Sequence, residues 1–302
     1  MSTSAKPIVF ITGASGMLGQ QLMSDLSANY QPLALQRDKS VPHHPTWNYQ
    51  STLEQLGIKS PHAVIHLAGA GIADQRWTED YKQLIRDSRI NGTEWLVNEM
   101  QSHAKQPQHF LCASAIGFYG HRPGETLSED STAGDNFVAE LAVQWEAATQ
   151  KLADTHTRVT NLRFGLMLDR SGGALKNMLL PFKLGLGGRI GSGEQIYSWV
   201  SLADVSHAIM FLLDKPMDGP VNITAPNPVS NRVFTTTLAK QLNRPAFIPM
   251  PAALARLVFK DLADELLLAD AKVMPQKLQQ AGFKFQNPTI DQGIQSALCI
   301  MY

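Results

Sequence analysis

Three glycines near the start of the chain have the spacing of a turn that binds phosphate groups. Gly13 permits a tight strand-to-helix turn, Gly16 lets the backbone approach a pyrophosphate, and Gly19 lets the next helix pack closely against the strand. They follow the apolar residues 8–12 and precede a helical pattern, Leu18, Leu22, Met23 and Leu26. Because a helix N-terminus offers free N–H groups and a positive dipole end, the segment predicts a nucleotide site. The alternative is a glycine-rich turn without function.

The residue after the second predicted strand indicates which nucleotide binds. That strand comprises residues 32–36, and Arg37 follows it, eighteen residues after Gly19. Dinucleotide folds place an acidic residue about there to accept hydrogen bonds from ribose hydroxyls. A guanidinium cannot accept such bonds but suits a 2′-phosphate. We therefore expect NADP(H) as cofactor. The neighbouring Asp38 leaves NAD(H) open, and a solvated Arg37 at a strand end is the other alternative.

Strand-like and helix-like stretches alternate through the first half of the chain. We expect strands at residues 63–68, 109–114 and 158–168, and helices at about residues 78–102 and 136–152. Repeated β-α-β units bury a parallel sheet between helices, so the expected fold class is α/β, a doubly wound parallel-sheet Rossmann domain. Ligands bind at the carboxyl ends of such strands. We expect convergence there of Gly13, Gly69, Ser114 and Arg163.

The character of the sequence changes after Leu168. Glycine-rich stretches at residues 171–173 and 185–193, and frequent prolines from Pro216 onward, indicate a smaller C-terminal α+β lobe that binds substrate. A helix at 202–213 and a strand at 221–224 return to the main sheet. The expected NADP-binding domain is thus 1–170 plus about 200–225, and the expected substrate lobe is about 171–199 plus 226–302. The glycines of 185–193 line the substrate pocket or form a turn between the lobes.

Composition excludes several classes of protein. The 302 residues are 44% hydrophobic and 17% charged, as in ordinary soluble domains, and the net charge of +0 suggests neither a nucleic-acid nor a membrane partner. No apolar run reaches the ~18 residues needed to span a bilayer. The first six residues lack a signal-peptide core, so we expect a cytoplasmic protein. The two cysteines, Cys112 and Cys299, form no metal-binding spacing, and we expect no metal site.

Several motifs together resemble an extended short-chain dehydrogenase/reductase, the class of sugar-nucleotide epimerases and dehydratases. These motifs are Gly13-x-x-Gly16-x-x-Gly19, His66-Leu-Ala-Gly69, Ser114 after its strand, and Ser198-Trp-Val-Ser-Leu-Ala-Asp204. Further segments resemble the YfcH-like epimerase family more narrowly: Ile85-x-x-Ser88-Arg89, Ser114-Ala-x-Gly117-x-Tyr119-Gly120, Trp145-Glu146-Ala-Ala148, Gly172-Gly-x-Leu-x-x-Met178, Pro181-Phe-x-x-Gly185-Leu-Gly-Gly188 and Gly191-x-Gly193-x-Gln195. Ala246-Phe-Ile-Pro-x-Pro251 and Val273-x-Pro275 fit that family's C-terminal domain of unknown function.

The resemblance implies which positions contact the cofactor. They are Gly13, Ser15, Gly16, Met17, Leu18, Gly19, Arg37, Leu67, Ala68, Gly69, Arg89 and Met167. Arg89 is equally well explained as a surface ion-pair residue. Leu84 stands where a relative uses a glutamate, which puts that contact in doubt.

The chain departs from ordinary reductases at the catalytic pair. Those enzymes place a Tyr four residues before a Lys on one helical face, and the Lys lowers the phenol pKa so that it can move a proton. None of the six tyrosines here has a Lys four residues on. The expected helix instead contains Phe137 and Leu141 at such a spacing. We therefore do not expect the ordinary epimerase or ketoreductase mechanism.

Ser114 and Tyr119 are the candidates to replace that pair. Ser114 could hydrogen-bond a substrate oxygen, and Tyr119 could donate a proton from the loop over the nicotinamide; the alternative is that Tyr119 packs the loop. Glu146 on the expected helix more simply supports packing or a backbone contact. Arg163 fits an anionic substrate and a structural salt bridge equally well.

Two functions remain open from the sequence. The first is an NADP(H)-dependent oxidoreductase or epimerase-like enzyme with an unidentified small-molecule substrate. The second is a non-catalytic nucleotide-binding regulatory protein, for example one related to cell division, since some relatives carry that label. A homodimer is the expected assembly.

Overall fold

The computed structural model describes residues 5–38, 46–103, 105–152 and 155–299; the ends of the two expected domains, at residues 1–4 and 300–302, lie outside this part. Its centre is a six-stranded parallel sheet in the order β12-β8-β6-β5-β1-β2. These strands are β1 (Ile8–Thr12), β2 (Gln31–Leu35), β5 (Ala63–His66), β6 (His109–Ala115), β8 (Arg158–Phe164) and β12 (Gly219–Ile223). The order reverses beside β1, as in a doubly wound fold.

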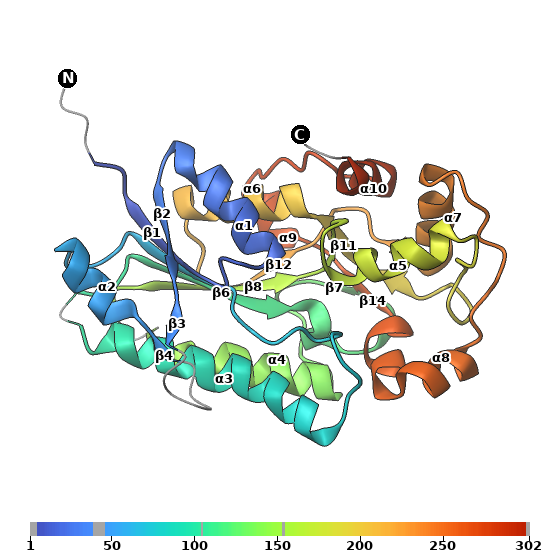
Figure 1. Ribbon diagram of the computed structural model, residues 1–302, viewed down its shortest axis with the longest axis horizontal. Helices are drawn as coiled ribbons and strands as arrows, with labels where there is room; N and C mark the ends of the chain where they lie inside the picture. Colours follow the sequence, from blue (N-terminus) through green and yellow to red (C-terminus); the bar gives the residue numbers. More distant parts are fainter. Residues whose placement is uncertain (1–4, 39–45, 104, 153–154, 300–302) are drawn as a thin grey trace.

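Helices cover both faces of this sheet, as Figure 1 shows. Helices α1 (Met17–Asp25) and α6 (Leu202–Asp214) pack together on one face, and α2 (Tyr49–Leu56), α3 (Glu79–Gln101) and α4 (Phe137–Ala147) lie on the other. Thr78 caps α3 and Asn136 caps α4 through their side-chain oxygens. With both faces covered, β1 and β5 are buried almost throughout. The predicted α/β Rossmann fold is confirmed.

The predicted strand 158–168 is two strands. β8 ends at Phe164, and Gly165 then approaches the backbone so closely that a Cβ there would lie 2.5 Å from the Ser198 carbonyl oxygen. The chain leaves the main sheet at this glycine and forms β9 (Leu166–Leu168), which pairs with β11 (Trp199–Ser201). The predicted strand 63–68 likewise ends at His66, and the predicted helix 136–152 ends its α-helical part at Ala147.

The remaining elements form the smaller C-terminal part. They are α5 (Gly173–Lys183), α7 (Asn231–Gln241), α8 (Ala252–Phe259), α9 (Gln276–Gln280) and α10 (Ile290–Leu298), with two small sheets in which β7 (Arg122–Leu127) pairs with β14 (Ala271–Val273) and β10 (Ile196–Tyr197) pairs with β13 (Val229–Ser230). The short strands β3 (Arg37–Asp38) and β4 (Thr46–Trp47) pair with each other outside this part, beside α3. A second hydrophobic cluster joins α5, α7, α10 and β11 around Trp199 and Phe234. Leu278 and Phe283, however, pack into the main core. No described helix has the length and hydrophobicity to cross a membrane. The expected domain boundaries stay a prediction.

Gly19 offers a test of how the first helix packs. A Cβ there would lie 2.3 Å from the Gly13 carbonyl oxygen and 2.6 Å from Ala14 Cα, whereas a Cβ at Gly16 would have no contact closer than 3.3 Å. Ala is ordinarily favoured over Gly inside a helix by about 0.5–1 kcal/mol. We expect Gly19→Ala instead to lower the free energy of unfolding by about 1–3 kcal/mol because of overpacking, and Gly16→Ala to change it little. Urea denaturation followed by circular dichroism measures both, and equal stabilities would contradict the packing argument.

Candidate functional site

The turn between β1 and α1 brings three predicted cofactor positions together. Gly13 has φ of 69°, a left-handed conformation that favours glycine. A Cβ on Gly13 would lie 3.0 Å from both the Leu67 carbonyl carbon and the Ala68 nitrogen, so the turn touches the residues that follow β5. The roles predicted for Gly13, as the tight turn, and Gly19, as the close-packing position, are confirmed. The approach of Gly16 to a pyrophosphate stays a prediction.

Thr12 fixes this junction from the end of β1. Its hydroxyl oxygen accepts hydrogen bonds from the backbone N–H groups of Leu67 (3.1 Å) and Ala68 (3.3 Å). The same oxygen lies 2.7 Å from His66 Nδ1. Burial lowers the pKa of His66 to about 3, so this ring is neutral at physiological pH. Thr12 can therefore donate its hydroxyl proton to Nδ1 while it accepts from the two backbone groups.

Helix α1 presents an uncapped N-terminus at the turn. Gly16 is its N-cap residue, no side chain caps the helix, and its first turn has no acidic residue. Ser15 and Gly16 are exposed, Met17 is half-buried, and Leu18 points into the core. The first N–H groups of the helix and its positive dipole end are thus available to an anion.

The two predicted cofactor arginines differ in their surroundings. Arg37 is exposed in β3, just beyond the end of β2. Arg89 is half-buried in α3; its guanidinium lies 5.1 Å from the Trp145 ring, and its Nη1 donates to the Ile85 carbonyl (3.3 Å). A Cβ on Gly69 would lie 3.5–3.6 Å from the Arg89 side chain, so these two positions adjoin. No ion pair of Arg89 occurs among the described residues.

Met167 lies on the other side of the predicted site. It is half-buried in β9, opposite Val200 of β11, and it packs against the main core. Gly172 follows a few residues further on, and a Cβ placed on it would lie 3.1 Å from Met17 Sδ. The segment after β9 therefore reaches the first turn of α1.

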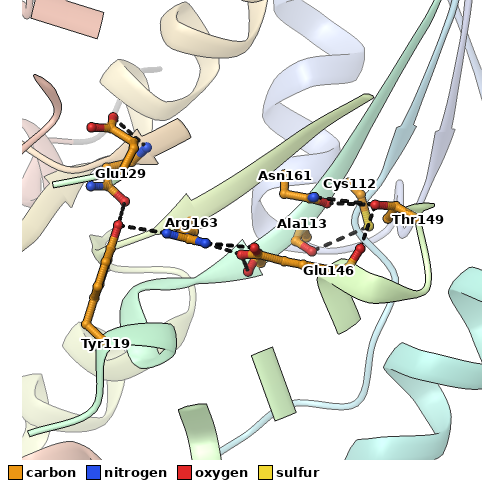
Figure 2. A network of polar contacts seen from close by, with 10 residues as sticks. Cys112, Ala113, Tyr119, Glu129, Glu146, Thr149, Asn161 and Arg163 are labelled. Atoms are coloured by element: carbon orange, nitrogen blue, oxygen red, sulfur yellow. Dashed lines mark hydrogen bonds and ion pairs between the residues drawn. The ribbon is translucent and has the colours of Figure 1, made fainter. Parts of the chain in front are cut away.

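Ser114 and Tyr119 belong to a buried polar network. Figure 2 shows its members Tyr119, Arg163 and Glu146. Ser114 Oγ donates to Glu146 Oε1 (2.7 Å), and Arg163 makes a two-pronged ion pair with the same carboxylate through Nε and Nη2, both at 2.8 Å. Arg163 Nη1 donates to the Tyr119 hydroxyl (3.0 Å), which donates in turn to Asn222 Oδ1 (2.7 Å). Of the two alternatives for Arg163, an anionic substrate or a structural salt bridge, the structure shows the salt bridge, with Glu146 as partner.

The network continues to the C-terminal part of the chain. Asn222 Nδ2 donates to the Met274 carbonyl (3.0 Å), and Glu129 Oε1 accepts from the backbone N–H groups of Asn222 (3.1 Å) and Lys277 (3.2 Å). Five structural elements thus meet around one chain of hydrogen bonds: β6, α4, β8, β12 and the 3-10 turn Ile116–Tyr119. Arg163 also stacks on Phe118, with 3.4 Å from its guanidinium carbon to the ring centroid.

The network limits the chemistry of both candidate hydroxyls. Ser114 is only 2% exposed and Tyr119 0%. Burial raises the pKa of Tyr119, and the positive charge of Arg163 only partly opposes this shift. That is the opposite of the lowered phenol pKa that proton transfer needs at neutral pH. The proton of Ser114 is directed at Glu146, so its hydroxyl can only accept from a further group. Their catalytic roles stay predictions.

Sequence reasoning missed Thr12, Glu129 and Asn222. Two of them carry a signal: Thr12 and Asn222 are polar residues in predicted buried strands, where a buried side chain must find a hydrogen-bond partner. Glu129 lies between predicted elements, and its sequence context carries no such signal.

Comparison with known families agrees with this geometry. Residues 9–224 match the model of the NAD dependent epimerase/dehydratase family, and residues 250–297 match a domain of unknown function, DUF1731. An epimerase family protein of Mycobacterium bovis is 36% identical over 294 residues, covering 96% of this chain and 97% of that protein. An epimerase family protein of Staphylococcus aureus is 34% identical over 295 residues, covering 95% and 98%.

Solved structures show the same architecture. The human epimerase family protein SDR39U1, determined with NADPH, superposes with a TM-score of 0.86 at 31% identity, covering 96% of this chain and 99% of that one. A nucleoside-diphosphate sugar epimerase from Corynebacterium glutamicum superposes with a TM-score of 0.77 at 29% identity, covering 97% and 58%.

The buried ion pair predicts a large difference between two Glu→Gln substitutions. Glu146→Gln leaves the Arg163 charge buried without its counterion, and we expect a loss of about 3–5 kcal/mol in the free energy of unfolding. Glu125→Gln removes the partner of Arg122 in an exposed ion pair, and we expect hardly any loss because solvent screens this pair. Tyr119→Phe should fall between them, at about 1–3 kcal/mol, since it leaves buried groups without a partner. Urea unfolding at neutral pH measures all three; similar small losses would mean that the network does not hold the fold.

Proposed function

This chain belongs to the NAD dependent epimerase/dehydratase family, and we propose that it is an NADP(H)-binding oxidoreductase or epimerase-like protein that acts on a small molecule. The observation that carries the proposal is the glycine turn from Gly13 to Gly19, which leads into an uncapped helix N-terminus at the carboxyl edge of the sheet. A dinucleotide pyrophosphate suits this place because both free N–H groups and the helix dipole favour negative charge.

The surrounding residues fit the rest of the cofactor. The end of β1 packs against the residues that follow β5, through contacts of Thr12 and Gly13 with Leu67 and Ala68. The backbone of Leu67 and Ala68 therefore lies beside the glycine turn. Gly69 carries no side chain between this edge and Arg89, so a ligand can approach that guanidinium. When bound, the nicotinamide supplies hydride transfer, and the residues of this chain hold and orient it.

Two arginines support the phosphorylated form of the cofactor. Arg37 stands where an acidic residue would otherwise accept from the ribose hydroxyls, and its exposed guanidinium can reach a 2′-phosphate. Burial lowers the pKa of Arg89 to about 10, which an anion placed against it would reverse. The human relative SDR39U1 is described with NADPH, in agreement with this preference.

The buried polar network is the proposed reaction centre. We propose Ser114 and Tyr119 as the polar groups of the reaction centre, with Arg163 and Glu146 setting their positions, and an unidentified small molecule as substrate. The burial of both hydroxyls specifically favours the second candidate, a nucleotide-binding regulatory protein without turnover. Oxidation of NADPH with a panel of carbonyl metabolites separates the two, since the second candidate binds the cofactor but never consumes it.

Arg37→Ala tests the cofactor proposal. We expect wild-type protein to bind NADPH more tightly than NADH, and the substitution to weaken NADPH binding about 10-fold or more while NADH binding hardly changes, because a charged hydrogen bond contributes about 1.5–3 kcal/mol. Nicotinamide fluorescence during titration measures both affinities. Arg158→Ala is the matched control, since Arg158 is also exposed but begins β8, at the amino end of the parallel strands and away from the cofactor site. An equal loss of affinity for NADPH and NADH would show that Arg37 does not recognise the 2′-phosphate. If the wild-type protein bound neither cofactor, the proposal would be overturned.

A further inference from the structure

One surface at the end of the molecule combines exposed apolar side chains with positive charge. We define this basic apolar face as residues 180–195, from the end of α5 through the next loop, together with residues 231–250, from α7 to the start of α8. Arg244 Nε donates to the Lys183 carbonyl (3.1 Å), and the Met250 N–H donates to the Arg189 carbonyl (2.9 Å), so the two segments adjoin. Figure 1 shows α5, α7 and the link to α8 at the right-hand end of the long axis.

Six large apolar side chains on this face lie in water. The exposed fractions are 65% for Leu180, 64% for Leu184, 58% for Leu186, 43% for Val233, 86% for Phe247 and 54% for Ile248. The backbone beneath them is closely packed: a Cβ on Gly188 would lie 1.7 Å from the Ile248 carbonyl oxygen. Contiguous exposed apolar side chains of this kind mark interaction sites. These side chains project from two segments that lie against each other.

The same residues carry a local excess of positive charge. Residues 180–195 and 231–250 contain one acidic residue, Glu194, and five basic residues, Lys183, Arg189, Arg232, Lys240 and Arg244. The chain as a whole has a net charge of +0, so the excess is compensated elsewhere. The expectation of no membrane partner rests on the net charge of the whole chain, and a total of this kind does not reveal a local excess of positive charge.

Two of the basic residues converge on a shallow hollow of about 230 Å³. A Cβ on Gly193 would lie 3.3 Å from the Cβ atoms of both Arg189 and Arg232, so these two side chains start side by side. Arg232 forms an exposed ion pair with Glu194, and Arg189 has no ion pair among the described residues. Phe247 forms part of the wall of the hollow. An anion held there would be attracted by the positive charges of both arginines.

Charge decides between the occupants of this face. A second copy of the chain, related by a twofold axis, would bring five basic residues against the same five, and like charges at an interface oppose association. An anionic surface complements the charge. Exposed aromatic and leucine side chains that project beside Lys and Arg are suited to the boundary between lipid headgroups and acyl chains.

We propose that the basic apolar face docks peripherally on a bilayer that contains anionic phospholipid. A lipid phosphate lies in the hollow between Arg189 and Arg232, and Phe247 and Leu186 enter the headgroup region. The attraction between basic residues and such a surface is electrostatic, so the attachment is reversible and weakens with salt.

Sedimentation with vesicles tests the proposal on the full chain. The probes are vesicles of phosphatidylcholine alone and vesicles of phosphatidylcholine mixed with phosphatidylglycerol. We expect binding only to the mixed vesicles and release at high salt. Arg189→Gln and Phe247→Ser should each lower the vesicle partition coefficient about fivefold or more, the equivalent of about 1 kcal/mol. Arg158→Gln and Leu84→Ser, at exposed positions of β8 and α3, are the matched controls and should bind like wild type. Circular dichroism confirms that each variant is folded.

Several outcomes would overturn the proposal. Absence of binding to both kinds of vesicle excludes it, as does equal binding to both kinds. Retention on heparin without binding to anionic vesicles would show that the face takes another polyanion. A dimer in analytical ultracentrifugation that Phe247→Ser converts to a monomer would show that a second copy covers the face. None of these results depends on whether NADPH binds.

Discussion

The ion pair between Arg163 and Glu146 is the constraint on which the centre of this structure depends. Both side chains are buried, and removing two charges from water costs several kcal/mol for each ion. The attraction between them offsets this cost only if every remaining donor and acceptor has a partner. Ser114, Tyr119 and Asn222 supply those partners, and in doing so they link β6, β8 and β12 to α4. The core polar groups therefore form one interdependent unit.

This constraint bears on the missing catalytic pair. In an ordinary reductase the helix after the β6-like strand carries a Lys that lowers the pKa of a neighbouring phenol. Here α4 presents Glu146, and its charge is matched by an arginine from β8. Burial holds the pKa of Tyr119 above its ordinary value. The hydroxyl protons of Ser114 and Tyr119 are both donated within this network, which favours rigidity over proton exchange. Proton donation by either hydroxyl therefore requires the network to rearrange when a ligand binds.

Sequence patterns were sufficient for the parts of the fold that depend on local chemistry. The glycine turn, the apolar strands and the start of the helix near residue 78 follow from residue type and spacing alone. The pairing of Arg163 with Glu146 depends on the rotation of α4 over the sheet, which periodicity does not specify. The exit of the chain at Gly165 depends on the approach of Ser198, which lies far along the sequence, between β10 and β11. Long-range contacts of this kind cannot be derived from local pattern.

The two partly or fully buried arginines show how charge pairing separates a structural role from a binding role. Arg163 loses hydration, which lowers its pKa, but the Glu146 carboxylate more than compensates and the net shift is upward. Arg89 also loses hydration, yet its pKa falls to about 10 because no carboxylate faces it in the described part of the chain. A guanidinium left in this state is destabilised until an anion arrives. Arg89 adjoins Gly69 at the carboxyl edge of the sheet, where a bound phosphate group would offset the cost of burying an unpaired charge. This supports the binding role proposed for Arg89, whereas Arg163 is already held in a structural ion pair.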